Sequence, residues 1–387
     1  MDSHTRRDFL RGAGAMGVAG LAGCVGNSGV LSPGGSGSDG GTPTDGEPPG
    51  STTGDGTTGG SNDVLPAKDP PVAADRLPVA YDVGKLRNSV QSGGPPKDGI
   101  PSIDDPKFVG TAKGDEFLDR DDIVFGVAGE DDVKAYPQPI LVWHEIVNDV
   151  IDGDPVSVTY CPLTGTAMGF ERGTTEFGVS GKLLNNNLVM YDRNTDSRWP
   201  QILATAIRGG FEGRSLREFR VVWTTWEQWK SLHPDTVVLS KKTGHVRNYE
   251  RDPYGMYTPK RGYYNSTKIL FHTLNDDDRY KPKTVVIGAR VPDGAIAFLK
   301  ESLRKAGVLE GQVAGVTHTA VYDDRLDTAY VYRNPDGVSV SLDGESATAT
   351  IDGESYAPDA LPLEPVHAFD AMWFAWSGFY PETEVVE

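Results

Sequence analysis

Residues 135–177 read AYPQPILVWHEIVNDVIDGDPVSVTYCPLTGTAMGFERGTTEF, and this stretch decides how the rest of the chain is interpreted. Residues 156–160 alternate larger β-branched or aromatic side chains with small polar ones, which is typical of a strand with one buried face. Pro162 has no amide hydrogen to give to a ladder, so the strand is expected to end at Cys161. Cys161 is therefore placed where a side chain can meet a cleft, and His144 lies seventeen residues before it.

The composition of the chain limits its partners. The 387 residues include 55 acidic and 37 basic ones, giving a net charge of −18. Strong acidity keeps a protein soluble and hydrated, a property that halophiles use, so we expect a halophilic source. No basic patch stands out, which argues against nucleic acid as a partner. Two cysteines are too few for a disulfide framework.

The N-terminus indicates export. Residues 5–11, TRRDFLR, resemble a twin-arginine signal built on Arg6 and Arg7. Residues 21–24, LAGC, resemble the lipobox of lipoproteins, which implies cleavage before Cys24 and lipidation of its thiol. We therefore expect residues 1–23 to be a signal and the protein to be anchored in a membrane at the cell surface through Cys24. The plainer alternative is an ordinary twin-arginine signal with a chance cysteine.

Two pairs of internal similarities follow the same order along the chain. Residues 123–136 align without gaps on residues 285–298, and residues 226–238 align on residues 373–385. The second pair superposes two tryptophans and a proline in each copy. Because the two matches are collinear, they favour an internal duplication over chance likeness between amphipathic segments.

The predicted fold class is α+β and strand-rich, with a duplicated unit of strands and a short helix. Residues 24–65 contain almost no apolar side chains and are expected to form a disordered Gly/Ser/Thr/Asp tether. The folded region divides into an irregular arm, a first repeat, a long loop and a second repeat, predicted at residues 66–119, 120–243, 244–283 and 284–387. A loop of that length in a compact domain tends to be functional or poorly ordered.

Local signals add detail to the first repeat. Residues 224–228, TTWEQ, match a capping box that opens a short helix, and Pro234 is expected to stop it. Residues 177–191 are apolar around Asn185, Asn186 and Asn187, which indicates two strands joined by the asparagines or bulged at them.

Several runs together resemble a family catalogued as a domain of unknown function in secreted bacterial and archaeal proteins. These runs are KAYPQPILVWHEIVND (134–149), VTYCPLTGTAMGFER (158–172), FGVSGKLLNNNLVMYDRNTDSRW (177–199), RDPYG (251–255) and MWFAWSGFYPET (372–383). The resemblance spans nearly the whole folded region and carries no activity with it. Where relatives often read Cys-Pro-Leu-Cys-Gly, this chain has Thr164 in place of the second cysteine. That departure argues against an indispensable dithiol mechanism.

Cys161 and His144 are the leading candidates for chemistry. A soft thiolate with an imidazole is a ligand set for copper or zinc, so one hypothesis is a metal held by His144 and Cys161. If Pro139 opens a helix, His144 and Asn148 share a face at a spacing of four residues. The remaining histidines show no close ligand spacing, so further ligands stay unassigned.

Other interpretations stay open. Cys161 could be a nucleophile with His144 as its base and with Asn148 or Glu145 orienting the imidazole, which would make the protein an extracellular enzyme. Free cysteine is among the most buried residue types, so a structural thiol in a structural surface protein is a further alternative. We expect a cell-surface protein that binds a metal or small ligand at the cleft around His144 and Cys161. The additional candidates for contacting an anionic or sugar-like ligand are Asn148, Arg172, Asp192, Arg193, Arg251, Asp252 and Tyr254.

Overall fold

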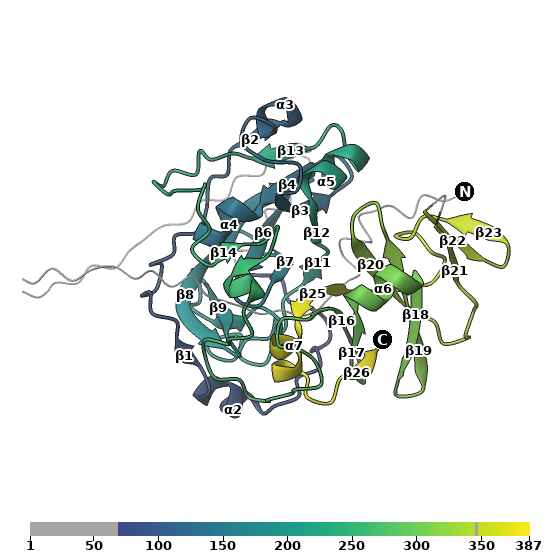
Figure 1. Cartoon of the computed structure of the whole chain (residues 1–387). Helices are drawn as coiled ribbons and strands as arrows, with labels where there is room; N and C mark the ends of the chain where they lie inside the picture. The colour runs from purple at the N-terminus through teal and green to yellow at the C-terminus, as the bar shows by residue number, and fades with distance from the viewer. Residues whose placement is uncertain (1–68, 345–346) are drawn as a thin grey trace, which may run out of the picture. The chain divides into compact units, whose positions relative to one another are not determined.

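The structure is a computed structural model that describes residues 69–344 and 347–387. The paired arginines Arg6 and Arg7, Cys24 and the tether lie outside these residues. The described part is an α+β fold made mostly of strands, which confirms the predicted class (Figure 1). None of the helices in residues 69–344 and 347–387 is long and apolar enough to span a membrane.

One set of elements, here called the first unit, occupies residues 123–239. Its main elements are β3 Ile123–Ala128, β4 Val133–Pro137, α4 Gln138–His144, β5 Ile146–Ile151, β6 Asp154–Cys161, β7 Thr166–Glu171, β12 Val222–Thr225, α5 Trp226–Leu232 and β13 Val237–Leu239. β6 ends at Cys161, as the sequence predicts. The capping box is also confirmed, since the Thr225 and Gln228 side chains each bond the other's backbone at the start of α5.

A second set, the second unit, occupies residues 285–386. Its main elements are β16 Val285–Val291, β17 Gly294–Leu299, α6 Lys300–Ala306, β18 Val308–Val313, β19 Val316–Asp323, β20 Thr328–Arg333, β25 Ala368–Met372, α7 Trp373–Phe379 and β26 Glu384–Val386. The kinds of element follow one another in the same order as in the first unit.

The two units also pair their strands alike. In one unit the order is β12-β3-β4-β13, with β2 paired beyond β13, and in the other it is β25-β16-β17-β26. The last neighbour is parallel in both cases, β13 beside β4 and β26 beside β17. β5, β6 and β7 form an antiparallel meander, as do β18, β19 and β20, and Cys161 opposite Thr166 has the same register as Asp323 opposite Thr328.

The tryptophans of α5 and α7 have matching surroundings. Trp229 donates from Nε1 to the hydroxyl of Thr236, and Trp376 donates to that of Thr383, at 2.9 and 3.0 Å. Each ring lies against a glycine of the neighbouring strand, Gly126 for Trp229 and Gly288 for Trp376. These correspondences are what a duplication predicts; its origin from one ancestral unit stays a prediction.

Apart from the hairpin strands β8 and β9, the elements outside this common plan are mostly short. Those before the first unit and within it are α2 Val83–Asn88, β1 Gln91–Ser92, β2 Phe108–Gly110, α3 Thr111–Gly114, β8 Phe177–Leu184, β9 Asn187–Asp192, β10 Arg198–Pro200 and β11 Glu218–Phe219. β8 and β9 form the predicted hairpin, joined at Asn185 and Asn186. Those that follow are β14 Gly255–Met256, β15 Arg261–Gly262, the 3-10 helix η1 Tyr263–Asn265, β21 Ser341–Asp343, β22 Thr348–Ile351, β23 Glu354–Tyr356 and β24 Glu364–Val366.

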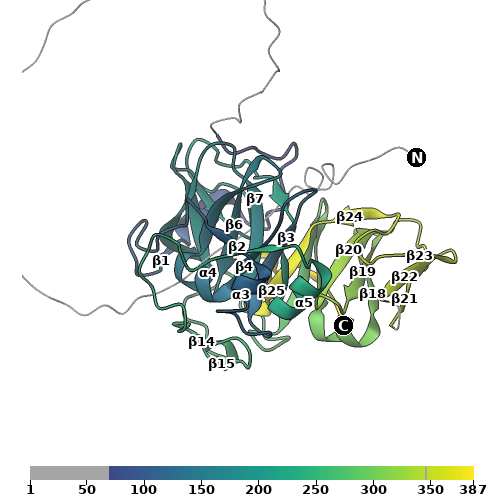
Figure 2. The ribbon, with the colours of Figure 1, turned by 90° about the horizontal axis from the view of Figure 1, so that it is seen from above.

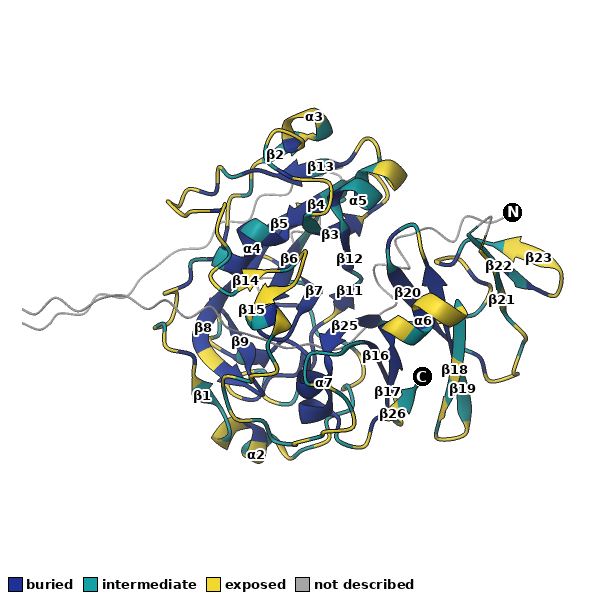
Figure 3. Ribbon diagram, viewed as in Figure 1, coloured by how far each residue is buried: buried dark blue, intermediate teal, exposed yellow. Residues whose placement is uncertain are grey.

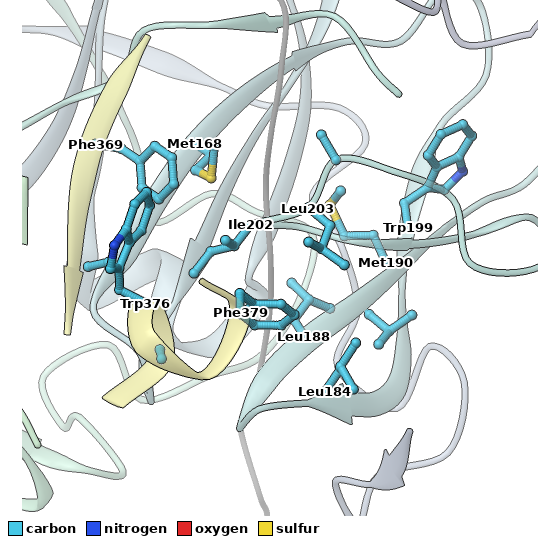
Figure 4. Packing of buried hydrophobic residues seen from close by; sticks show 14 of the residues in the cluster. Met168, Leu184, Leu188, Met190, Trp199, Ile202, Leu203, Phe369, Trp376 and Phe379 are labelled. Atoms are coloured by element: carbon cyan, nitrogen blue, oxygen red, sulfur yellow. The ribbon is translucent and has the colours of Figure 1, made fainter. Parts of the chain in front are cut away.

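The largest apolar core joins the two units. α7 and β25 of the second unit contribute Trp376, Phe379 and Phe369, which pack with Leu188 and Leu203 from the first (Figure 4). In the two perpendicular views of Figure 1 and Figure 2, β25 lies between the strands of the first unit and the meander β18–β20. Because this core takes side chains from both units, each unit depends on the other for burial.

Candidate functional site

Cys161 lies fully buried at the turn between β6 and β7. Its sulfur accepts hydrogen bonds from the amide of Thr164, at 3.2 Å, and from the hydroxyl of Thr164. Asn187 at the start of β9 donates from Nδ2 to that same hydroxyl oxygen at 2.7 Å. Thr164, which stands where the resemblance leads one to expect a second cysteine, therefore bonds the sulfur of Cys161.

The electrostatics of this position favour a protonated thiol. Burial raises the pKa of Cys161 to about 12, although hydrogen bonds from Thr164 and Asn187 act to lower it. An ionised Glu145 carboxyl would raise the pKa of the thiol further. Since the thiolate is the nucleophile and the metal ligand, this cysteine is poorly prepared for either role at neutral pH.

His144 does not share these contacts. Its Nδ1 donates to the carbonyl of Pro101 at 2.8 Å, and its Nε2 accepts from the hydroxyl of Tyr249 at 2.8 Å. Burial lowers the pKa of His144 to about 4, with smaller lowering contributions from His245 and Arg247, so the imidazole is neutral. In residues 69–344 and 347–387, the hydrogen bonds of His144 do not include Cys161.

The structure corrects the proposed role of Asn148. α4 ends at His144, and Asn148 lies in β5, so the two do not share a helix face. The Asn148 amide instead donates to Asp104 and to the carbonyl of Phe177, and its oxygen accepts from Ser157. The sequence reasoning assumed a longer helix because it had no signal for the left-handed residue that stops α4.

That residue is Glu145, with φ of +59° directly after the helix. Its side chain is fully buried, and neither carboxyl oxygen has a hydrogen-bond partner within the described parts of the chain. Burial raises the pKa of Glu145 well above its ordinary value, so the carboxyl is held neutral. An unpartnered buried carboxyl is costly, which makes it the most unusual group near Cys161.

Most of the other predicted contact residues hold the fold together. Arg172 donates to four backbone carbonyls, those of Val156, Gly173, Thr175 and Asp149. Asp192 is buried and accepts from the amide and hydroxyl of Thr195 and from the indole of Trp199. Arg193 pairs with the carboxylates of Asp104 and Glu176. The sequence could not distinguish these internal roles from ligand binding.

The Arg251–Tyr254 segment has two different roles. The carbonyl of Arg251 accepts from the indole of Trp143, while its side chain is exposed. Asp252 accepts from Gln138 at 2.8 Å and from the hydroxyl of Tyr264 at 2.9 Å, and burial raises the pKa of its carboxyl. Tyr254 faces a hollow.

This hollow, which we call the aromatic hollow, has a volume of about 570 Å³. Its walls are mostly apolar and come from the turn after Cys161 and from the long loop between the units: Leu163, Pro253, Tyr254, Tyr263, Leu270 and Phe271. Ser266 and Lys268 add polar groups at its edge. The loop's exposed hairpin β14–β15 stands in front of the buried strand β6 (Figure 3).

The aromatic hollow and Cys161 belong to one packed region. Tyr254, Tyr263 and Phe271 pack against the cluster that Cys161 forms with Leu163. The hydroxyl of Tyr263 also donates to the carbonyl of Leu163 at 2.8 Å. The hollow nearest to the predicted cleft at Cys161 is therefore the aromatic hollow. His144 instead lies among Pro101, His245 and Tyr249.

The metal hypothesis finds little geometric support. Across residues 69–344 and 347–387, no group of three or more His, Cys, Asp or Glu side chains is placed to hold a metal ion. Both ring nitrogens of His144 are already engaged, and the thiol of Cys161 is protonated. Copper or zinc held by this pair would require both side chains to exchange their present partners.

Comparison with known proteins gives one match. The model of the family described as "Protein of unknown function (DUF3179)" matches residues 97–383. The chain belongs to this family. The match confirms the family membership that the sequence runs predict. It covers the first unit, the loop between the units and the second unit up to residue 383. No curated protein and no solved structure matches the chain.

Proposed function

We propose that this family member is an exported lipoprotein that binds a small ring-bearing molecule in the aromatic hollow. The observation that carries the proposal is an open, preformed hollow with aromatic walls, seated on the turn that follows Cys161. The sequence predicts a binding site between His144 and Cys161. We propose instead that the ligand binds in the aromatic hollow, next to the turn that follows Cys161.

The size and lining of the hollow support this proposal. Sites for small molecules have volumes of about 300–1,000 Å³ and are lined mainly by apolar and aromatic side chains with few polar groups. Tyr254, Tyr263 and Phe271 offer ring faces that can stack on a planar or sugar ring. Lys268 at the edge can meet an acceptor group on the ligand.

The loop that forms the wall is held in place by a partly buried lysine. Lys283 donates from Nζ to the carbonyls of Tyr263 and Ser266, and its ammonium lies 3.3 Å from the centre of the Tyr263 ring. Burial lowers the pKa of Lys283 to about 8. The hydrogen bonds from Lys283 to the loop carbonyls support a wall that is already ordered before a ligand binds. Such order reduces the entropy cost of binding.

The enzyme alternative has less support. A cysteine nucleophile needs a lowered pKa or an adjacent base, and the thiol of Cys161 has a raised pKa and accepts hydrogen bonds from Thr164. His144 bonds elsewhere with both nitrogens. A binding function requires neither group to react.

Export and anchoring are part of the same proposal. They are supported by Arg6, Arg7 and the lipobox-like residues ending in Cys24. The test expresses the full chain and its Cys24→Ser variant and separates membranes from soluble protein. We expect the parent chain in the membrane fraction and the variant released; a variant that stays membrane-bound with unchanged mass would contradict lipidation.

Binding is tested with the aromatic anion 8-anilinonaphthalene-1-sulfonate, followed by its fluorescence during titration of the folded protein. Leu270 is 42% exposed and lines the hollow, whereas Val246 is 95% exposed and does not. Leu270→Asp is expected to weaken dye binding at least about tenfold, and the matched variant Val246→Asp to leave it unchanged. Equal binding by both variants would refute the proposal, and thermal melts of both confirm that they are folded.

A further inference from the structure

A second hollow, here called the inter-unit hollow, lies where the first unit meets the second. Its volume is about 250 Å³. Gly165, in the turn after Cys161, is part of its wall, so this hollow and the aromatic hollow use the same four-residue turn at different residues. We propose that the inter-unit hollow binds a small organic carboxylate with a short apolar tail.

Among the described residues, the charges around the hollow leave one cation without an ion pair. Lys300 pairs with Asp370 at 2.6 Å, and Arg304 pairs with Asp327 at 2.6 Å. Lys260 lines the same hollow, but in the described ranges of the chain its ammonium has neither an ion pair nor a hydrogen bond. Three cations face two carboxylates, so the hollow has an excess of one positive charge in a chain whose net charge is −18.

A neutral donor stands next to this lysine. The ammonium of Lys260 lies 5.3 Å from the centre of the Tyr257 ring. Within residues 69–344 and 347–387, the hydroxyl of Tyr257 makes no hydrogen bond, and its pKa is raised by burial and by the carboxylates of Asp370 and Asp252. The hydroxyl therefore keeps its proton and can donate it to an acceptor in the hollow.

Gly165 keeps this hydroxyl accessible. Its φ is +56°, and a Cβ at this position would lie 3.2 Å from the hydroxyl oxygen of Tyr257. A larger side chain would occupy the space beside the hydroxyl. The turn thus leaves the hydroxyl of Tyr257 free to meet a ligand oxygen.

The remaining walls indicate the kind of ligand. Ile123, Trp223 and Val285 are apolar and line the same hollow. A single excess positive charge suits a monoanion, and a carboxylate can accept from an ammonium and a hydroxyl at once. Lys260 is an exposed residue, but the protein atoms around its ammonium, followed by repulsion from Arg304 and Lys300, lower its pKa. A bound carboxylate would relieve that repulsion. An apolar tail would then lie against the tryptophan.

The test is calorimetric titration of the folded protein with sodium butyrate at constant ionic strength. Lys260→Met is expected to weaken butyrate binding at least about tenfold, and Tyr257→Phe to weaken it severalfold. The matched control Lys242→Met removes an exposed lysine that does not line the hollow and should leave binding unchanged. Thermal melts check that each variant is folded.

Three results would overturn the inference. The first is butyrate binding that is the same in Lys260→Met as in the parent. The second is a heat signal that an equal concentration of sodium chloride reproduces. The third is tight binding of inorganic phosphate without binding of butyrate. That result would mean that the apolar walls do not contribute to ligand binding. Because Leu270→Asp alters only the aromatic hollow, unchanged butyrate binding in that variant separates this inference from the proposed function.

Discussion

The first and second units use the same scaffold for different purposes. Both run strand, strand, helix, three-stranded meander, strand, helix and strand, with the same pairing and register. Their differences concentrate at equivalent positions near the ends of strands and helices. Cys161 corresponds to Asp323 and Glu145 to Gly307, and Gln138, which opens α4, corresponds to Lys300, which opens α6.

At two of these positions the second unit has a charged side chain that is paired with an opposite charge. Asp323 bonds the guanidinium of Arg325, and Lys300 bonds Asp370. The first unit has neutral or unpartnered groups there: a protonated thiol, a carboxyl without partners and an amide. Functional sites often keep such costly groups where a purely structural copy would replace them. The comparison teaches that the first unit, together with the loop after it, is the more specialised part.

The largest expected effect concerns the buried ion pair of the second unit. Lys300→Gln, which copies Gln138, is expected to lower the free energy of unfolding by about 3–5 kcal/mol, because Asp370 is left buried without its cation. Lys300 and Asp370 side chains are only 5% and 8% exposed. Denaturation with guanidinium measures the change.

The double variant Lys300→Gln, Asp370→Asn is the control for that experiment. It removes both charges and leaves two neutral polar groups, so it should recover most of the lost stability. A double variant as unstable as the single one would show that packing, rather than charge, distinguishes the units here.

The next prediction concerns His144, whose counterpart in the second unit is Ala306. The pKa of His144 is about 4 in the folded protein, against 6.5 for an ordinary histidine. The unfolded chain therefore binds more protons between these values, and stability falls as pH drops from about 6.5 to 4. The shift corresponds to about 3 kcal/mol for this buried group.

His144→Gln should remove that part of the acid dependence. The exposed His272→Gln is the matched control and should keep it. The measurement is the free energy of unfolding at pH 7 and pH 4 for all three proteins. If His144→Gln loses as much stability on acidification as the parent does, the histidine is not buried in its neutral form.

The tryptophan and glycine contacts test the likeness of the units. A Cβ on Gly126 would lie 2.2 Å from the ring of Trp229, and one on Gly288 would lie 2.3 Å from the ring of Trp376. Gly126→Ala and Gly288→Ala should each cost about 2–3 kcal/mol through overpacking. Gly210→Ala, where a Cβ meets nothing within 4 Å, is the control. If the loss in free energy of unfolding differs widely between Gly126→Ala and Gly288→Ala, the two tryptophan sites are not equivalent.

The smallest effect is expected from a thiol reagent. Because burial raises the pKa of Cys161 to about 12, iodoacetamide at pH 8 should leave it unmodified in the folded protein and modify it after denaturation. The mass increase is measured by mass spectrometry on a chain that carries Cys24→Ser, in which Cys161 is the one remaining cysteine. Rapid labelling of the folded protein would revive the enzyme interpretation.

Much of the fold could be predicted because its signals are local. The alternation before Pro162 predicts a strand that ends at Cys161, and the Thr225 capping box predicts the start of α5. The hairpin around Asn185 and Asn186 follows from turn chemistry. In each case the information lies within a few residues of the feature.

The site could be predicted only in part, because its contacts are distant in sequence. A short turn brings the backbones of β5 and β6 together, but it does not set the direction of the His144 side chain. That direction depends on Pro101 and Tyr249 and on the left-handed Glu145. The sequence reasoning included Tyr254 but missed Tyr263 and Phe271, and the unusual length of the inter-unit loop was the one available signal.

The central claim is that the aromatic hollow is a binding site, and the position of a bound probe tests it most directly. The measurement is a crystal structure of the folded protein soaked with 8-anilinonaphthalene-1-sulfonate. We expect the dye's rings in contact with Tyr263 and Phe271 and its sulfonate on the side of Lys268. Dye bound elsewhere, with the aromatic hollow free of it, would contradict the account.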